Sequence, residues 1–397
     1  MKQIDSKNTS PAPERKRSYT IRAVARAATV LHAFGSMEEV LDLKTVAARA
    51  ALNKPTVFRL LETLVESGCL ERAGRQGYRS LLEQRRTRRF RIGYAEQSRI
   101  LPFTAEVSDG LAAAAASANI ELLVLNNQMS ARTSLQNAER FVTEHVDLVI
   151  DSQINANVAA QIGARFSDAG IPYIAIDIPH PGATYFGADN YKAGRIAGRY
   201  LGRWTKQFWE GLPAQMIMLG VDAAGPLLNT RLAGMLDGLR EQAPAVATLP
   251  CQHYDTKGGQ FEAALDTVRR HLRRARPRRT LVCAVNDTTA LGALQAFREA
   301  GMEQECAIAG QDASLQAREE MRRPSTRLIC SVAYFPETYG PRLIQLALDI
   351  LNHKPVPPAI FIDHRLVTPE NVNRIYPNDT WMQETAKHGT QLQSNQA

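Results

Sequence analysis

The sequence lacks long apolar runs and an export signal. No segment of the 397 residues approaches 18 uninterrupted apolar residues, and the first 18 residues, MKQIDSKNTSPAPERKRS, are mostly polar and contain no apolar run. A membrane-spanning helix needs about 20 apolar residues, and a signal peptide needs an apolar centre. We therefore expect no membrane partner, no export and a cytoplasmic location.

Cysteine and histidine are scarce and scattered. The eight histidines do not cluster at the spacing of metal ligands, so we expect no metal site. The five cysteines form an odd set without CxxC spacing, and several lie in apolar runs, which indicates free thiols in a reducing compartment. These cysteines are Cys69, Cys251, Cys283, Cys306 and Cys330.

Motifs of the common enzyme classes are missing as well. No GxGxxG follows an expected strand, and GxxxxGK[ST], GxSxG and HExxH do not occur. We predict no catalytic residues and no cofactor. The strongest catalytic candidate is Asp177 with Asp312, but a pair of carboxylates suits hydroxyl binding equally well. An enzyme acting on a small carbohydrate-like substrate and a solute-binding protein remain the alternative functions.

Positive charge is concentrated in the first quarter of the chain. Residues 1–91 contain 19 Lys and Arg against 9 Asp and Glu, a net charge of +10, whereas the remainder contains 29 against 31, a net charge of −2. Phosphate contacts supply most non-specific DNA affinity, so a segregated basic module favours a nucleic acid partner. A solvated basic tail is the alternative reading of the charge alone.

The basic region has the periodicity of a helix-turn-helix. Apolar residues recur at helical spacing from Ile21 to Leu31, over 43–50 and from Val57 to Val65. Asn53 is a good N-cap, and Pro55 is tolerated in a first helical turn. The following CLERAGRQGYRS reads as a two-stranded hairpin, or wing. This order predicts a winged helix-turn-helix, whose alternative is a helical hairpin used for dimerisation.

The third helix is expected to enter the major groove of operator DNA, and the wing to contact the phosphate backbone. The residues opposite the apolar stripes are the candidate contacts. They are Lys44, Thr45, Asn53, Lys54, Thr56, Phe58 and Arg59 in the helices, and Arg72, Arg75 and Arg79 in the wing. The segment from SYTIRAVARAATVLHAF to GCLERAGRQGYRS resembles the DNA-binding domain of IclR-type regulators over about residues 19–80.

From residue 91 onward, strand-like apolar runs alternate with helical stretches. RIGYA, IELLVLN, VDLVID and IPYIAID are followed by QMIMLG, TLVCAV and CAIAG, with helices between them. This alternation predicts an α/β fold with two doubly wound, parallel-sheet lobes. Ligands of such sheets bind outside the carboxyl ends of the strands, so the cleft between the lobes is the expected site.

Several segments of this region resemble the LacI-type regulators and the periplasmic sugar-binding proteins, over about residues 91–376. They include IAIDIPHPGATYFGADNYKAGRIAGRYL, GPLLNTRLAGMLDGL, HYDTKGG, AVNDTTALGALQAFREAG and IAGQDAS. The resemblance implies a site for a sugar-like effector that combines aromatic faces with hydroxyl-binding Asp, Asn and Arg. The implied ligand residues are Phe103, Asp177, Asn229, Arg231, Tyr254, Asn286, Asp312 and Tyr334.

Some of these residues have a structural alternative. Asn286 and Asp287 fit equally well as helix caps, and for Asp189 and Asn190 capping is the preferred reading; Phe103 and Tyr334 fit a core equally well. The chain also departs from the sugar-binding relatives. Ile178 stands where they often have arginine, and Leu101 where they have asparagine. These departures indicate a ligand that is less hydroxylated or partly apolar.

The complete prediction is a ligand-responsive transcription regulator that acts as a homodimer or higher homo-oligomer, because paired half-sites need two recognition helices. Ligand binding is expected to close the lobes and to change the spacing of the two winged helices. The expected organisation is a disordered tail (1–18), the winged helix-turn-helix (19–80), a basic linker (81–91), the two-lobed domain (92–376; lobe 1 as 92–188 plus 335–363, lobe 2 as 189–334 plus 364–376) and a disordered tail (377–397).

Overall fold

The structure is a computed structural model that describes residues 21–34, 39–74, 77–81, 89–275 and 278–379. The chain divides into two compact units between Arg88 and Arg89. The expected N-terminal tail, most of the basic linker, Arg75 and residues 380–397 lie outside the described residues.

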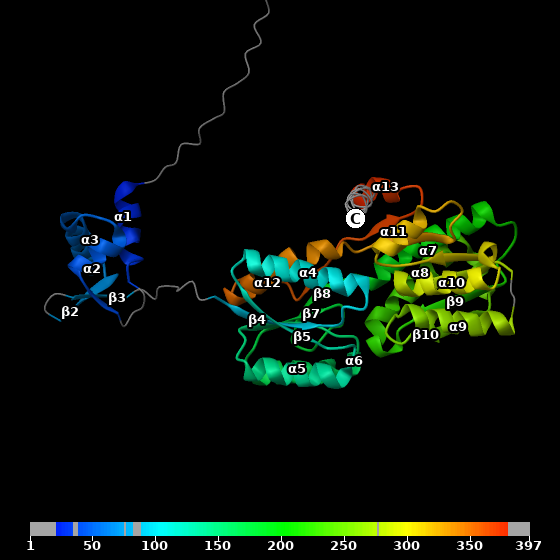
Figure 1. Ribbon diagram of the computed structural model, residues 1–397, viewed down its shortest axis with the longest axis horizontal. Coiled ribbons are helices and arrows are strands. Elements are labelled where there is room, and N and C mark those ends of the chain that lie inside the picture. Colours follow the sequence, from blue (N-terminus) through cyan, green and yellow to red (C-terminus); the bar gives the residue numbers. More distant parts are fainter. Residues whose placement is uncertain (1–20, 35–38, 75–76, 82–88, 276–277, 380–397) are drawn as a thin grey trace, which may run out of the picture. The chain divides into compact units, whose positions relative to one another are not determined.

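The first unit consists of helices packed beside a small antiparallel sheet (Figure 1). Strand β1 was not expected, because three residues are too few to show an alternating pattern; Leu41 alone points into the core. The sheet order is β1-β3-β2. The elements are α1 (Arg22–Leu31), β1 (Val40–Asp42), α2 (Leu43–Ala50), α3 (Lys54–Glu66), β2 (Leu70–Ala73) and β3 (Gly77–Ser80).

Side-chain caps fix the two helices of the helix-turn-helix. The Asp42 carboxylate accepts a hydrogen bond from the Thr45 backbone N–H at 2.8 Å, and the Asn53 side chain accepts one from Thr56 N–H at 3.0 Å. Helix α3 buries Val57, Leu61 and Leu64, as its apolar spacing predicts. The turn between the helices therefore follows from local sequence.

The first lobe of the second unit is a six-stranded parallel sheet with the strand order β14-β8-β7-β6-β4-β5. Helices α4 and α12 cover one face of the sheet, and α5 and α6 cover the other (Figure 1). The elements are β4 (Arg91–Glu96), α4 (Pro102–Ser117), β5 (Glu121–Asn126), α5 (Ala131–Thr143), β6 (Leu148–Ser152), α6 (Ala156–Asp168), β7 (Tyr173–Ile176), β8 (Thr184–Gly187), α12 (Tyr339–Leu351) and β14 (Ala359–Phe361).

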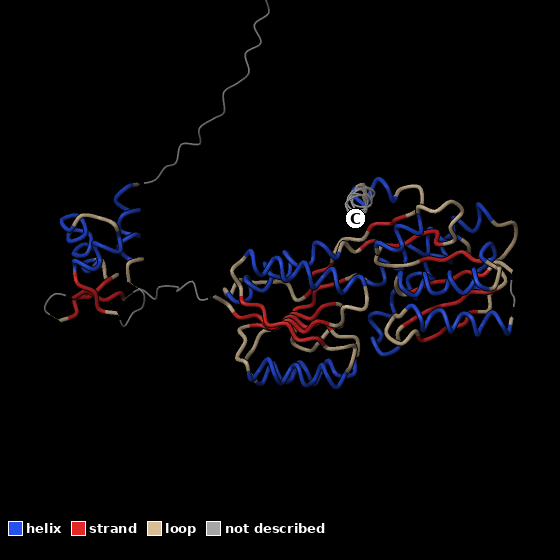
Figure 2. Tube along the Cα trace, in the orientation of Figure 1, coloured by secondary structure: helices blue, strands red, loops and turns tan. Residues whose placement is uncertain are grey.

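The second lobe repeats this plan with the strand order β10-β9-β11-β12-β13-β15. Its strands are parallel except for β15, which pairs antiparallel with β13. In each lobe the sheet lies between layers of helices (Figure 2). The elements are α7 (Asn190–Phe208), β9 (Gln215–Gly220), α8 (Gly225–Gln242), β10 (Cys251–Asp255), α9 (Phe261–Arg274), β11 (Thr280–Ala284), α10 (Asp287–Glu299), β12 (Cys306–Ala309), α11 (Leu315–Met321), β13 (Leu328–Ala333), β15 (Arg365–Val367) and α13 (Val372–Ile375).

The chain crosses between the lobes three times. The crossings follow β8, β13 and β14, at residues 188–189, 334–338 and 362–364. We expected a disordered tail from residue 377 onward, but residues 377–379 are described. The Asp379 carboxylate holds them to the second lobe by pairing with Arg318 at 2.7 Å and with Arg322 at 2.9 Å. Three short crossings at one side of the sheets form the hinge on which the lobes can move.

Helices α7 and α8 pack unusually closely through glycine. A Cβ atom added to Gly198 would lie 1.9 Å from the Met235 carbonyl oxygen, and one added to Gly194 would lie 1.9 Å from that of Arg231. The close approach fixes the position of Arg231, which faces the cleft. The glycines in KAGRIAGRY are therefore part of the support of the site.

Gly198→Ala is expected to destabilise the second unit by about 1–3 kcal/mol, because the helices must separate to admit one methyl group. Thermal unfolding of the full chain measures the effect. Gly110→Ala is the matched control, because its Cβ would meet no atom closer than 3.8 Å, and alanine is the better helix former. Equal melting temperatures for Gly198→Ala and the parent protein would contradict the packing described.

All five cysteines are free: Cys283, Cys306 and Cys330 are buried, Cys69 is half-buried and Cys251 is exposed. Among the described residues, no helix combines the length and the apolarity needed to cross a bilayer.

Candidate functional site

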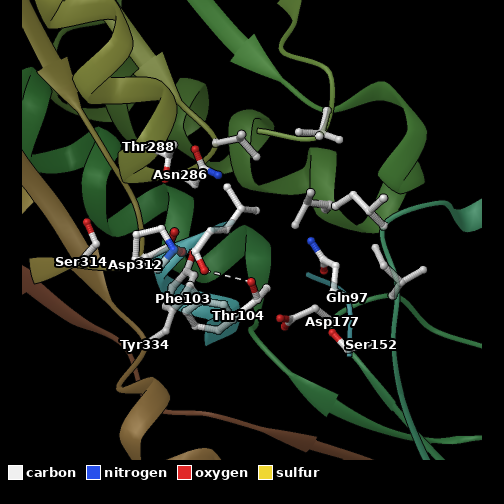
Figure 3. Close-up of a pocket in the computed structure, with 18 of the residues that line it drawn as sticks. Gln97, Phe103, Thr104, Ser152, Asp177, Asn286, Thr288, Asp312, Ser314 and Tyr334 are labelled. Carbon is white, nitrogen blue, oxygen red and sulfur yellow. Dashed lines mark hydrogen bonds between the residues drawn. The ribbon is translucent and has the colours of Figure 1, made fainter. Parts of the chain in front are cut away.

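A pocket of about 80 Å³ lies between the two lobes of the second unit, at the carboxyl ends of their strands. Side chains from both lobes line it (Figure 3). Lobe 1 contributes Gln97, Leu101, Pro102, Phe103, Thr104, Ser152, Gln153, Ile154, Asp177 and Ile178, and lobe 2 contributes Val221, Leu228, Arg231, Gly258, Val285, Asn286, Thr288, Asp312 and Ser314, with Tyr334 from the hinge.

Six of the eight predicted ligand residues line this pocket: Phe103, Asp177, Arg231, Asn286, Asp312 and Tyr334. The other two do not. Tyr254 lies on the edge strand β10 and turns toward α9, where its hydroxyl contacts His271 Nδ1 at 2.9 Å. Asn229 precedes Arg231 by two residues, which is more than half a turn of α8, so both side chains cannot face the pocket.

Arg231 is the buried cation of the pocket. Its Nε donates to the Asn190 side-chain oxygen at 3.0 Å, and Nη1 donates to the Val285 carbonyl at 2.6 Å. The guanidinium also lies over the Tyr334 ring, with its carbon 4.8 Å from the ring centroid. These contacts hold the guanidinium in one orientation, and no described residue forms a hydrogen bond with its Nη2. Asn190, which we expected to act only at the start of α7, is therefore a positioning residue for Arg231.

Asp177 follows β7 with a left-handed backbone, at a φ of 59°. Its Oδ1 accepts a hydrogen bond from the Ala188 N–H at 3.2 Å. Gly187 permits this arrangement, because a Cβ there would lie 2.3 Å from the same oxygen. Burial raises the pKa of the carboxyl, although Arg231 and the Ala188 N–H oppose the rise. Backbone strain of this kind often occurs at functional sites.

Asp312 follows β12 and also has a positive φ, 101°. Burial raises the pKa of its carboxyl, and the nearby Arg231 lowers it. The neighbouring Asp287 has a structural role, because its carboxylate accepts hydrogen bonds from the Ser331 hydroxyl at 2.6 Å and the Ser314 N–H at 2.7 Å. The pocket thus places one cation near two carboxylates, a set that can both donate to and accept from ligand hydroxyls.

The aromatic residues form one side of the pocket. The Phe103 ring meets the Tyr334 ring edge-on, with centroids 6.3 Å apart, and the Tyr339 ring at 5.5 Å. The Tyr334 hydroxyl donates to the Gln311 side chain at 2.6 Å. Phe103 and Tyr334 therefore line the pocket and pack against buried neighbours at the same time.

Asn286 combines the two roles that the sequence left open. Its side-chain oxygen caps α10 by accepting from Thr289 N–H at 2.9 Å, and its amide nitrogen donates to the Gly259 carbonyl at 3.1 Å. The residue also lines the pocket. Asp189 caps α7 through the Lys192 N–H at 3.0 Å, as expected.

Sequence reasoning missed most of the neutral lining residues. Gln97, Ser152 and Gln153 lie at or just after the ends of β4 and β6, where the rule for strand ends could have found them. Thr104 lies one residue after Phe103 in the first turn of α4. Aliphatic residues such as Leu228 gave no signal, because their side chains are indistinguishable in sequence from core residues.

His364 lies in the hinge, and the fold keeps its side chain neutral. Its Nε2 accepts a hydrogen bond from the Asp189 backbone N–H at 3.1 Å, and burial together with Arg231 lowers the pKa of His364 from 6.5 to about 4. A folded state that favours the neutral form has its full stability above pH 6.5 and loses it as the pH falls toward 4.

His364→Gln is therefore expected to reduce the loss of stability of the second unit between pH 6.5 and 4, because glutamine can accept the same hydrogen bond without titrating. Denaturant unfolding at several pH values, compared between variant and parent, isolates this histidine from the carboxylates that titrate in the same range. Parallel stability curves for the two proteins would contradict the role given to His364.

The first unit presents a basic surface on its helix-turn-helix. Lys44, Lys54 and Arg59 are exposed and form no ion pair with any described residue. Thr45 and Thr56 are half-buried and Phe58 is exposed, while Asn53 is exposed but serves as the cap of α3. The N-terminal part of α3 therefore combines free cations with one exposed aromatic ring.

Two of the predicted wing contacts are occupied within the unit. Arg72 pairs with Glu62 at 2.5 Å, and Arg79 donates to Glu71 at 2.6 Å. These exposed ion pairs contribute little to stability, so each arginine can leave its glutamate for a DNA phosphate, but neither arginine is a free cation. Arg75 lies outside the described residues.

Comparison with known proteins assigns both parts of the chain. Residues 97–355 match the periplasmic binding protein domain, and residues 23–74 match the IclR helix-turn-helix domain. The ribose import binding protein RbsB of Salmonella typhimurium is 24% identical over 67% of this chain and 86% of its own, and that of Bacillus subtilis is 24% identical over 70% and 87%.

Solved structures share the fold of the second unit. The Caulobacter myo-inositol binding protein bound to myo-inositol aligns with a TM-score of 0.63 and 20% identity, over 73% of this chain and 96% of that protein. A Mycobacterium smegmatis protein in complex with β-D-fucofuranose aligns with a TM-score of 0.65 and 19% identity, over 75% and 97%. Both predicted resemblances and the predicted fold class are confirmed. The chain belongs to the periplasmic binding protein domain family, with an IclR helix-turn-helix domain preceding that domain.

Proposed function

We propose that this protein is a transcription regulator whose affinity for operator DNA is set by a sugar or sugar-like metabolite bound between the two lobes. The observation that carries the proposal is that one chain joins an IclR helix-turn-helix domain to a periplasmic binding protein domain with a pocket built around Asp177, Arg231 and Asp312. A cytoplasmic location follows from the operator as the partner.

The chemistry of the pocket favours a polyhydroxylated ligand. Two carboxylates and a held guanidinium can pair with several hydroxyls, while Phe103 and Tyr334 offer apolar ring surface to C–H groups. The matched relatives are named for ribose, and the matched structures hold myo-inositol or a furanose. We therefore propose a pentose, a hexose or a cyclitol as the effector class.

The proposed mechanism is a shift between two states of the second unit. The ligand contacts residues of both lobes, so it binds the closed form better than the open form. A dimer would convert closure into a change in the spacing of two recognition helices. The start of α1 supports association of two copies, because Val24 and the N-cap residue Ile21 are 63% and 69% exposed.

Ligand binding and DNA binding are the only activities that we assign, and we propose that the protein is not an enzyme. The carboxylates of Asp177 and Asp312 serve as acceptors for ligand hydroxyls in this account. Turnover of a bound sugar by the purified protein would overturn this part of the proposal.

Thermal unfolding of the full chain in the presence of pentoses, hexoses, deoxy sugars, cyclitols and polyols tests the effector class. A ligand at 100 times its dissociation constant adds about 2.7 kcal/mol to the stability of the second unit. We expect one or more members of the panel to raise the melting temperature. If none does, and isothermal titration also detects no binding, the effector is not a sugar.

A further inference from the structure

One side of the pocket is apolar and is not explained by hydroxyl binding. Five aliphatic side chains form it, and we call them the apolar wall: Ile154, Ile178, Val221, Leu228 and Val285. All five belong to one hydrophobic cluster, completed by small alanines. Ile178 and Val285 are only 2% and 1% exposed.

The apolar wall is made by both lobes. Ile154 and Ile178 follow strands β6 and β7 of lobe 1, whereas Val221, Leu228 and Val285 belong to lobe 2. The wall therefore exists only when the lobes are closed. A ligand group that packs against it contacts both lobes and stabilises the closed form.

The wall begins directly beside the polar groups. Ile178 is the next residue after Asp177, Val285 precedes Asn286, and the Val285 carbonyl accepts the hydrogen bond from Arg231. In Figure 3 the labelled side chains Asp312, Ser314 and Tyr334 lie on one side of the pocket. Gln97, Asp177 and Ser152 lie on the other, and sticks without coloured atoms gather beside them. Because both groups of side chains line the same pocket, one ligand meets both.

A hydroxyl packed against the wall would lose its water, and the five wall side chains offer it no hydrogen bond, which weakens binding. A hydrogen or methyl group in the same place gains from the burial of apolar surface. We propose that the effector is a deoxy or alkyl-substituted sugar, whose hydroxyls pair with Asp177, Arg231 and Asp312 while its methyl or methylene group packs on the apolar wall. This inference rests on the proposed function and narrows its ligand class.

The test compares deoxy sugars with their hydroxylated parents. Isothermal titration of the full chain uses 6-deoxy-D-glucose with D-glucose, D-fucose with D-galactose, L-rhamnose with L-mannose, and 2-deoxy-D-ribose with D-ribose. We expect the tightest-binding pair to favour its deoxy member by about tenfold or more, the discrimination typical of one group in an apolar pocket.

The outcomes separate this inference from the proposed function. If sugars bind but every parent binds as tightly as its deoxy partner, or more tightly, the inference is wrong and the sugar-responsive function stands. If no member of any pair binds, the inference is overturned, whereas binding of a cyclitol or of another sugar in the thermal-unfolding panel keeps the proposed function.

Val285→Thr checks that the wall is the cause of the preference. Threonine has nearly the volume of valine but supplies a hydroxyl, so we expect the preference for the deoxy sugar to fall by about tenfold, mainly through tighter binding of the parent. Ile178→Val is the control that keeps the wall apolar and should keep the preference. Ile178→Gln is the second polar variant if Val285→Thr does not fold, as judged by thermal unfolding without sugar. An unchanged preference in a folded polar variant would overturn the inference.

Discussion

Replacing Asp177 with alanine is expected to weaken binding of the sugar effector by about a hundredfold or more, while DNA binding without effector stays unchanged. A hydrogen bond to a charged group contributes about 1.5–3 kcal/mol, and each 1.4 kcal/mol is a factor of ten in affinity. The carboxyl lies in the pocket, so its loss also removes a counter-charge of the buried Arg231. Isothermal titration measures the effector affinity directly.

Two further variants make this result specific. Asp177→Asn keeps the size of the side chain and one acceptor oxygen, so we expect a smaller loss of affinity. Asp168→Ala, an exposed aspartate at the end of α6 in the same lobe, should leave effector binding unchanged. If Asp177→Ala still binds the effector and responds to it normally, the pocket described is not the effector site.

Arg59→Ala is expected to lower the affinity for operator DNA by about tenfold or more and to leave effector binding intact. Arg59 is exposed on the recognition helix and has no ion-pair partner among the described residues. A contact to a base edge contributes about 1–3 kcal/mol, whereas losing a contact to phosphate alone lowers the salt dependence of binding by about one released ion. Either contact makes the residue important for binding.

Fluorescence anisotropy with a DNA fragment selected by the protein from a random pool measures this effect at several salt concentrations. Arg72→Ala is the matched comparison, because Arg72 already pairs with Glu62 and its transfer to phosphate gains less. We expect the loss for Arg59→Ala to exceed that for Arg72→Ala. Equal losses, or no loss for Arg59, would place the DNA contacts elsewhere.

The parts of the fold that local sequence encodes could be predicted. Asn53 caps α3, and Val57, Leu61 and Leu64 pack inward, because a cap and a 3.6-residue period are local properties. Seven of the parallel strands were equally legible as apolar runs between helical stretches, but the buried strands β8 and β13 were not predicted. Strand β10 was missed because it is an edge strand: its sequence, CQHYD, is mostly exposed and therefore polar.

The candidate site was predictable where it follows strand ends and not where it depends on tertiary packing. Asp177 directly follows β7, Asp312 lies three residues after the end of β12, and both line the pocket. Tyr254 also ends a strand, but that strand lies at the edge of the sheet, and its side chain turns away toward His271. The pairing of Arg72 with Glu62 is likewise set by the packing of α3 on the wing, which spacing in sequence does not reveal.

The apolar wall illustrates the same limit. Sequence showed that Ile178 replaces a polar residue of the sugar-binding relatives, which indicated a partly apolar ligand. It did not show that Val221, Leu228 and Val285 of the other lobe meet Ile178 in one cluster. That meeting depends on the closure of two lobes, and no local pattern encodes it.

The central claim is that the two units form one switch, and reciprocal titration tests it most directly. The affinity of the full chain for its selected DNA fragment is measured with and without the tightest-binding sugar, and the affinity for that sugar is measured with and without the DNA. Linkage requires both ratios to equal the same factor, and we predict a factor of at least about five, in the usual range for allosteric proteins. A factor of one in both directions would contradict the account.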